Sequence, residues 1–282
     1  MSDNDSIDSG YSINSQDIDI VDGEGKTILI IAVEDKDMRL YFEVLSKNPN
    51  PNIQDVYGRT ALIYAVLANQ VKIVKDLLYI GADVLLRDQD GYTALIYALE
   101  NGSKQIIDLL IDNATDNAIY HTSNLRYVNI LLSKISPESI TADLINHFIY
   151  KNQLKIVKIL IEKRGQFNDT DALLTALYYK RKSIIKYLLV NNADIHIINK
   201  NGRNCLMMAA MGNSKKYVSF FLKKGFDINA VDGFGNSALC SAILHHSDKV
   251  VRYLIKKGAK TDDPNVLAAI KQHNLVKLIR FA

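Results

Sequence analysis

A short motif recurs along this chain at a fixed spacing of 33 residues, and this period constrains the fold more than any other feature. Its centre is a glycine that follows an Asp or Asn by three positions and precedes an apolar residue by four. The glycines form two series, Gly25, Gly58 and Gly91 in the first and Gly202 and Gly235 in the second. A period of this length is typical of a stacked array of small units rather than a single compact core.

Each unit contains two helical patterns. In the second unit, Leu62, Ala65 and Val66 recur at three- to four-residue spacing, which predicts the apolar side of a first helix. Val74 lies in the apolar stripe of a second helix, and Gly81 is the kind of residue that ends one. The chain is therefore predicted to be all-α, with each helix pair burying its apolar side against the next.

Capping residues test this register independently. The units are aligned by apolar residues alone, and a helix N-cap is expected two positions before the leading apolar residue, where Ser, Thr, Asp or Asn is favoured. All of these positions carry such a residue: Thr27, Thr60, Thr93, Asp143, Asp171, Asn204, Ser237 and Asn265. Two unrelated physical requirements thus agree on the register.

The array is predicted to span residues 22–282 with about eight to nine units, and its middle departs from the period. Val128 follows Ile107 by 21 residues, which is twelve short of a full unit. The fourth unit, near residues 113–137, is therefore predicted to be degenerate, without its loop and part of its first helix. The last unit is expected to begin near Asn265 and to be cut short within its second helix.

Residues 1–21 differ from the array in composition. They are rich in Ser, Asp and Asn, without Lys or Arg, which predicts a disordered acidic tail. The net charge of +3 hides a contrast, since residues 1–150 carry 11 basic and 22 acidic side chains and residues 151–282 carry 23 and 9. Net charges of −11 and +14 make the array a dipole that can steer a charged partner.

Several classes of protein are not expected. The sequence shows no secretion signal and no apolar run long enough to span a membrane, so a soluble protein is predicted. Two cysteines, Cys205 and Cys240, do not form a disulfide framework, which favours a reducing compartment. No Cys/His spacing fits a zinc site, and no phosphate loop or paired acid–base set is present. The chain is predicted to use no cofactor or metal and not to be an enzyme.

The motif resembles that of the ankyrin-repeat family. The family pattern Asp-x-x-Gly-x-Thr-Pro-Leu-His-x-Ala reads here Asp55-Val-Tyr-Gly-Arg-Thr-Ala-Leu-Ile-Tyr-Ala65, and the closing Gly-Ala-Asp reads Gly81-Ala-Asp83. The likeness covers about residues 22–282. It implies an ankyrin-repeat solenoid of helix–turn–helix units with short β-hairpin-like loops.

Two positions of the family pattern differ in this chain. The family Pro is replaced by Ile28, Ala61, Ala94, Cys205 and Ala238. The family His is replaced by Ile30, Ile63, Ile96, Met207 and Cys240. Pro at the first helical position is favourable but dispensable. Loss of the His predicts junctions held by apolar packing, with both cysteines buried as small apolar residues.

The resemblance also implies a function, the binding of another protein through the loop tips and the concave side of the first helices. Positions that face this groove in the family are occupied here by Tyr57, Arg59, Tyr64, Gln89, Tyr92, Tyr97, Arg203, Met208 and Phe234. Tyr and Arg are the residues that most often carry interface energy. An alternative stays open, in which the tyrosines pack between units and turn their hydroxyls to water.

Basic pairs precede a glycine at three places, Lys163-Arg164, Lys223-Lys224 and Lys256-Lys257. These are predicted last turns of second helices, where cations complement the helix dipole, so a structural role is expected. An acidic protein partner is one alternative. Nucleic acid or an anionic membrane is a weaker one, because no nucleic-acid-binding motif accompanies the lysines.

The partner is predicted to be another protein, bound by a monomeric, cytoplasmic adaptor or scaffold. One alternative comes from the tail, where Asp8-Ser9-Gly10-Tyr11-Ser12 resembles the phosphorylation-dependent degron of the IκB inhibitors, with Ser9 and Ser12 as phosphorylation sites. Another is a microbial or viral effector that engages proteins in a host cytoplasm, suggested by the abundance of Ile, Asn, Lys and Tyr.

Overall fold

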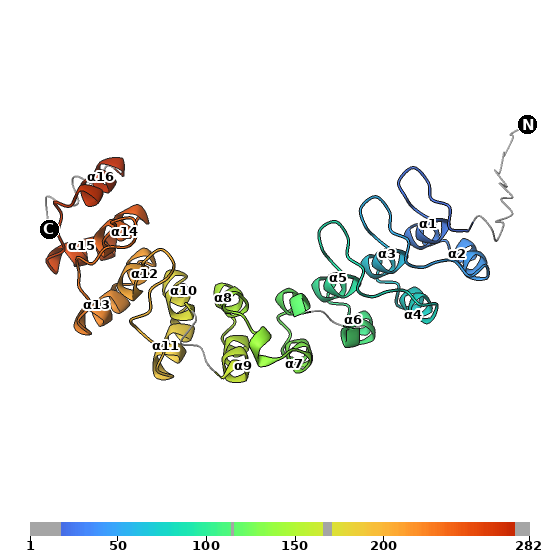
Figure 1. Ribbon diagram of the computed structural model, residues 1–282, viewed down its shortest axis with the longest axis horizontal. Coiled ribbons are helices and arrows are strands. Elements are labelled where there is room, and N and C mark those ends of the chain that lie inside the picture. The colour runs from blue at the N-terminus through green and yellow to red at the C-terminus, as the bar shows by residue number, and fades with distance from the viewer. Residues whose placement is uncertain (1–17, 114–115, 166–170, 274–282) are drawn as a thin grey trace, which may run out of the picture. The chain divides into compact units, whose positions relative to one another are not determined.

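The computed structural model describes residues 18–113, 116–165 and 171–273, and there the chain is built from pairs of helices (Figure 1). It divides into two compact units, residues 1–134 and residues 135–282, called unit 1 and unit 2 below. The described residues contain no strand, and their β pairing consists of three isolated antiparallel bridges. The predicted all-α class is confirmed.

Unit 1 begins with three complete helix pairs. The first helices are α1 (Ile28–Glu34), α3 (Ala61–Leu67) and α5 (Ala94–Asn101). The second helices are α2 (Met38–Leu45), α4 (Val71–Tyr79) and α6 (Lys104–Leu110). The first helices pack on one another in chain order, and each also packs on its own second helix, so the pairs form two layers.

The fourth pair has no first α-helix among the described residues. After α6 the chain forms two 3-10 segments, η1 (Ile111–Asn113) and η2 (Asp116–His121), and then α7 (Leu125–Lys134). Segment η2 packs on both α5 and α7, which correspond to the preceding first helix and the second helix of the same pair. Only 21 residues separate Ile107 from Val128. This length accommodates the 3-10 segment η2 but leaves no residues for a finger-like loop.

Unit 2 opens with the 3-10 turn η3 (Pro137–Ser139) and repeats the same two layers. Its first helices are α8 (Ala142–Tyr150), α10 (Ala172–Tyr178), α12 (Cys205–Met211), α14 (Ala238–Leu244) and α16 (Pro264–Gln272). Its second helices are α9 (Leu154–Arg164), α11 (Lys182–Val190), α13 (Lys215–Lys223) and α15 (Asp248–Lys256). Each first helix again packs on the next.

The first helices α3 and α12 lie in the interior of their units because they are apolar on nearly every side. All residues of α12 are buried, as are residues 61–66 of α3, whereas α4 buries only Ile73, Val74 and Leu77. The residues that replace the family His are fully buried: Ile30, Ile63, Ile96, Met207 and Cys240. Buried apolar side chains therefore fill the position of the family His at each of these junctions.

Most of the predicted helix starts are confirmed. Five N-cap side chains accept the backbone N–H three residues further on: Thr27, Thr60, Thr93, Asn204 and Ser237. Asp171 lies at an N-cap but makes no side-chain bond there. The caps predicted at Asp143 and Asn265 are wrong, because Thr141 and Asp263 cap α8 and α16. Both helices have 9 residues, whereas α3 has 7. An N-cap placed two positions before the leading apolar residue therefore falls two residues, about half a turn, inside each of these longer helices.

The last residues assigned above to the acidic tail belong to unit 1. Ile18 is buried, and Oδ1 of Asp19 accepts the backbone N–H of Asn50 at 2.9 Å. Val21 forms a bridge with Thr27. Packed structure therefore begins before residue 22. The two candidate phosphorylation sites, Ser9 and Ser12, lie outside the described residues.

Candidate functional site

The loop before each first helix, called a finger below, is closed by an Asp or Asn side chain. Oδ1 of Asp55 accepts the backbone N–H groups of Tyr57 at 2.9 Å and of Arg59 at 2.8 Å. The corresponding two bonds are made by Asp22, Asp88, Asn199 and Asp232. Such bonds from Asp or Asn to the following backbone stabilise a turn locally, so each finger holds its shape without a partner.

Neighbouring fingers are joined by backbone hydrogen bonds. In unit 1, the N–H of Val56 donates to the carbonyl of Glu24, and the N–H of Gln89 donates to that of Tyr57, both at 2.9 Å. In unit 2, the N–H of Gly233 donates to the carbonyl of Asn201, also at 2.9 Å. The joined fingers therefore form one continuous edge within each unit.

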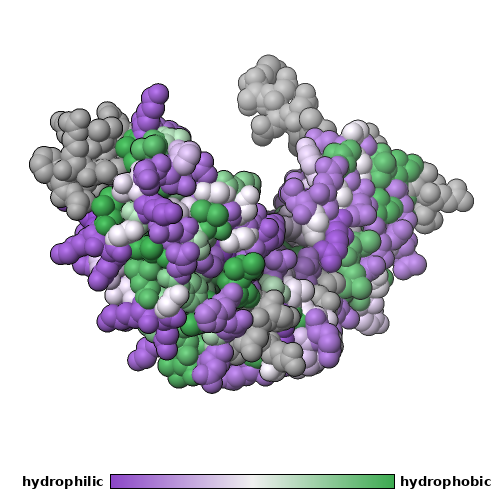
Figure 2. All heavy atoms as spheres, turned by 60° about the vertical axis from the view of Figure 1, so that its left-hand side comes forward, coloured by the Kyte–Doolittle hydropathy of each residue, from purple (hydrophilic) through white to green (hydrophobic). Residues whose placement is uncertain are grey.

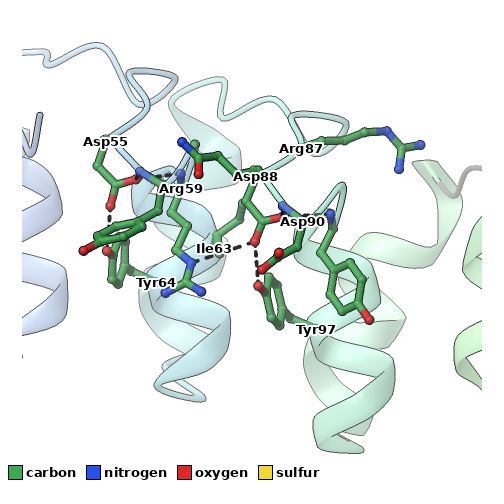
Figure 3. Close-up of polar contacts among 12 residues, drawn as sticks. Asp55, Arg59, Ile63, Tyr64, Arg87, Asp88, Asp90 and Tyr97 are labelled. Atoms are coloured by element: carbon green, nitrogen blue, oxygen red, sulfur yellow. Dashed lines mark hydrogen bonds and ion pairs between the residues drawn. The ribbon is translucent and has the colours of Figure 1, made fainter.

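In unit 1 the second oxygen of the finger carboxylate accepts a tyrosine hydroxyl. The hydroxyl of Tyr64 donates to Oδ2 of Asp55 at 2.6 Å, and that of Tyr97 donates to Oδ2 of Asp88 at 2.5 Å (Figure 3). Burial, followed by the bond to Asp55, raises the pKa of Tyr64 to about 12, so this hydroxyl stays protonated and donates at neutral pH. Both hydroxyls brace their fingers and are not turned to water as the packing alternative assumed.

The arginine after the finger glycine reaches the carboxylate of the following finger. Nε of Arg203 donates to Oδ2 of Asp232 at 3.0 Å, and Nε of Arg59 lies 3.8 Å from Oδ2 of Asp88. Figure 3 shows the guanidinium of Arg59 between Tyr64 and Tyr97. Because both carboxylates are buried, these ion pairs are better shielded from solvent than surface pairs. The two arginines thus link adjacent repeats as well as lining the surface.

The ionised state of Asp232 is expected to stabilise unit 2. Burial raises the pKa of Asp232, but the N–H of Asn236, the guanidinium of Arg203 and the N–H of Phe234 outweigh it and lower the pKa below 3.8. The pKa of Asp232 is lower in the folded state than the unfolded-state pKa of about 3.9, so the ionised carboxylate stabilises the fold above that pH. This stabilisation is lost as the pH falls through the pKa of the folded state. Asp232→Asn is therefore expected to reduce the free energy of unfolding by about 1–3 kcal/mol at neutral pH, and this reduction should shrink as the pH falls below about 3.9.

Urea unfolding of both proteins across this pH range measures the effect. Asn199 closes the same turn one repeat earlier, which shows that Asn fits the geometry. The reverse exchange, Asn199→Asp, is the control and should leave the turn intact, because Asp closes the same turn at position 232. A loss for Asp232→Asn that is the same at both ends of the pH range would show that its charge is not the cause.

The structure places the nine residues of the predicted groove at three depths. Tyr57, Gln89 and Phe234 are exposed at finger tips, with 53% of Tyr57 and 64% of Phe234 accessible. Four residues are half-buried: Arg59, Tyr92, Tyr97 and Arg203. Tyr64 and Met208 are buried, each with 8% accessible. The buried pair can shape the surface but offers little area to a partner.

Within unit 1 the predicted residues form connected groups. The rings of Tyr92 and Tyr97 pack with centroids 5.4 Å apart, and the guanidinium of Arg59 lies 5.9 Å from the ring of Tyr57. The side-chain amide of Gln89 donates to the carbonyl of Val56 at 2.6 Å. In unit 2, Arg203 lies 5.9 Å from the ring of Phe234. Each unit therefore has its own aromatic and cationic cluster.

Sequence reasoning missed a set of exposed aliphatic side chains on the fingers. Ile198, Val231 and Val21 directly precede the finger Asn or Asp, and Val56 directly follows one. All four are exposed. The spacing of 33 residues between Ile198 and Val231 was a usable signal. Ile198, Val231 and Val21 each form the β-bridge of their finger, where β-branched residues are favoured, and this placement leaves their side chains in solvent.

The basic pairs lie where they were predicted. Lys163 and Arg164 are in the last turn of α9, and Lys223 and Lys256 are in the last turns of α13 and α15. Lys224 and Lys257 are the C-caps of the latter two helices. This confirms that their positions suit the helix dipole.

Both cysteines are buried and free, as predicted. Burial raises the pKa of Cys205 to about 12 and that of Cys240 to about 11, so both thiols stay protonated at neutral pH. Within the part of the chain that the structure describes, no helix is long and apolar enough to cross a membrane.

Family models match most of the chain. A model of ankyrin repeats in three copies matches residues 5–88 and 173–265, and a model of a single ankyrin repeat matches residues 90–121. The stretch between residues 121 and 173, which includes α7, α8 and α9, lies outside the matches. The comparison with curated proteins gives no match. The matched ranges, together with the helix pairs and the fingers, show that the chain belongs to the ankyrin-repeat family, whose repeats generally serve as protein–protein interaction modules.

Proposed function

We propose that this protein is a non-enzymatic adaptor or scaffold that binds a partner protein through its finger tips and the adjoining surface of its first helices. The observation that carries the proposal is the contrast on each finger between a satisfied backbone and exposed apolar tips. The turn N–H groups are bonded internally, while Val56, Tyr57 and Phe234 remain exposed. Solvent-exposed apolar side chains on a rigid support favour binding.

The rigidity of the fingers supports tight binding with few contacts. Ordering a loop on binding costs free energy, and a loop that is already ordered avoids this cost. The fingers of unit 1 are held by the bonds between Asp55 and Tyr64 and between Asp88 and Tyr97, and by the backbone bond from Gln89 to Tyr57. Tyr57 and the neighbouring Arg59 are residue types that often dominate interface energies.

A photo-crosslinking amino acid placed at Tyr57 or at Phe234 in cells tests the proposal. A partner is expected to be captured from these positions and not from Tyr79, an exposed tyrosine at the end of the second helix α4. With the captured partner purified, Tyr57→Ala is expected to raise the Kd by about tenfold or more, because exposed aromatics at an interface centre often contribute over 1 kcal/mol.

Tyr79→Ala is the matched control, since it removes an even more exposed tyrosine that lies off the fingers, and the Kd should not change. Tyr64→Ala is less suitable, because it also removes the bond to Asp55. Capture of the same proteins from Tyr79 and Tyr57 would contradict a finger-based interface, and so would a Kd that Tyr57→Ala leaves unchanged.

The compartment that we propose is the cytoplasm. The proposal is supported by the two free, buried cysteines, which suit a reducing environment, and by an array that uses no disulfide to hold it together. The protein is proposed to act as a monomer and without a cofactor.

A further inference from the structure

A groove on the second-helix layer of unit 2 offers a second surface, separate from the fingers. It lies between the C-terminal halves of α13 and α15 and has a volume of about 350 Å³. Leu222, Phe226 and Ile228 form its apolar wall, and Tyr253 lies on the α15 side. Lys223 and Lys257, both exposed, line it as well. The groove therefore combines an apolar interior with positive charge.

The positive charge of the lysines around the groove is larger than the negative charge of the two helix C-termini. Each helix C-terminus carries about half a negative charge, and each of these two helices ends in a pair of lysines. In the described part of the chain, neither Lys223 nor Lys257 has a carboxylate within ion-pair distance. The nearest acid along the chain, Asp227, adds one carboxylate against the four lysines at the ends of these two helices. The groove is left with a net positive field.

Unit 2 as a whole is positively charged. Residues 135–165 and 171–273 carry 21 Lys or Arg and 10 Asp or Glu, a difference of 11 positive charges. On the face drawn in Figure 2, hydrophilic residues predominate and hydrophobic ones gather in small groups between them. A small apolar groove bordered by lysines matches a partner with negative charge and one small apolar element.

Both aromatic rings of the groove already have partners within the chain. The ring of Phe226 is stacked on His196 at 5.2 Å with an interplanar angle of 4°, and it also packs on Phe221 at 5.3 Å. The ring of Tyr253 has the ammonium groups of Lys215 at 5.1 Å and of Lys257 at 5.9 Å. Because single-stranded nucleic acids gain much of their affinity from stacking on aromatic faces, the geometry favours a peptide.

We propose that this groove docks an acidic segment of a partner protein, in which one aliphatic side chain is flanked by carboxylates. The aliphatic side chain enters the groove between Leu222 and Ile228, and the carboxylates pair with Lys223 and Lys257. The inference goes beyond the proposed binding by the fingers, because it assigns a second, chemically different partner segment to the second-helix layer of unit 2.

Fluorescence anisotropy of the full chain with a labelled synthetic peptide, Asp-Asp-Leu-Asp-Asp, tests the proposal. The double variant Lys223→Glu with Lys257→Glu is expected to raise the Kd by about tenfold or more. The matched control is Lys224→Glu with Lys256→Glu, which makes the same charge change on neighbouring exposed lysines outside the groove. It should raise the Kd by less than about threefold, because only long-range attraction is lost.

Additional binding measurements distinguish the proposed peptide from other ligands of the groove. Replacing the peptide's leucine by serine should weaken binding by about tenfold, because the apolar contact is lost. Equal losses in the two double variants, no effect of the serine, or tighter binding of single-stranded DNA or of phosphatidylserine vesicles would each overturn the proposal. Tighter peptide binding after deletion of residues 1–17 would overturn it too, since the chain's own acidic segment would then be the occupant. Tyr57→Ala should leave peptide binding unchanged. A negative result for the groove can therefore be distinguished from a negative result for the fingers.

Discussion

Gly58→Ala is expected to lower the free energy of unfolding of unit 1 by about 3–5 kcal/mol, through backbone strain and overpacking together. Gly58 has φ +76°, and a Cβ there would lie 2.9 Å from Cα of Asp88 and 3.0 Å from N of Gln89. These are backbone atoms of the next finger, which the bond from Gln89 to Tyr57 holds in place. Urea unfolding followed by circular dichroism measures the loss.

Gly91→Ala is the matched control for this prediction. Gly91 occupies the same turn position with φ +79°, but a Cβ there would meet no atom within 4 Å. Its replacement should cost only the left-handed backbone strain, about 1–2 kcal/mol. The difference between the two variants therefore measures the contact between adjacent fingers. Equal losses would contradict the claim that close approach of the fingers requires glycine at Gly58.

Phe148→Ala in α8 is expected to lower the stability of unit 2 by about 3–5 kcal/mol, because it leaves a large cavity in a fully buried position. The effect should stay within unit 2. Stability in repeat arrays passes between neighbouring repeats, and the fourth pair, which has η2 in place of a first α-helix, is the weak neighbour. Urea unfolding of the whole chain is therefore expected to proceed in two steps.

Hydrogen exchange measured by mass spectrometry distinguishes the units, which intrinsic tryptophan fluorescence cannot do because the chain contains no Trp. In Phe148→Ala, protection should fall in the peptides of residues 135–282 and stay constant in those of residues 1–113. Ile63→Ala, in α3, is the mirror experiment and should affect unit 1 alone. Protection lost in both units together in either variant would show that the array unfolds as one.

The register of the helices could be predicted because it depends on short-range chemistry. The threonines at positions 60 and 93 and Ser237 cap helices as expected, since capping needs a backbone N–H only three residues away. The two wrong caps, Asp143 and Asn265, come from helices that begin two residues earlier than in the other repeats. A Thr or Asp that can cap stands at the earlier position as well, so the local pattern alone allows both starts.

The candidate site was harder to predict, because exposure depends on neighbours a full repeat away. Tyr57 and Tyr64 both fit the family's groove positions, yet one is exposed and the other is buried against Asp55. Met208 stands at the position of Tyr64 in a later repeat and is also buried. The link from Arg203 to Asp232 joins residues 29 apart, which no local pattern predicts.

The amino-acid sequence was sufficient to establish the period, the paired helices, most helix starts and the shortened fourth repeat, because each of these follows from residues within about one helix pair. The tertiary structure was needed to show which tyrosines brace a finger and which one meets solvent, and to bring Lys223 and Lys257 to the same groove. Those outcomes depend on packing between repeats, where residues some thirty positions apart compete for the same space and the same hydrogen-bonding partners.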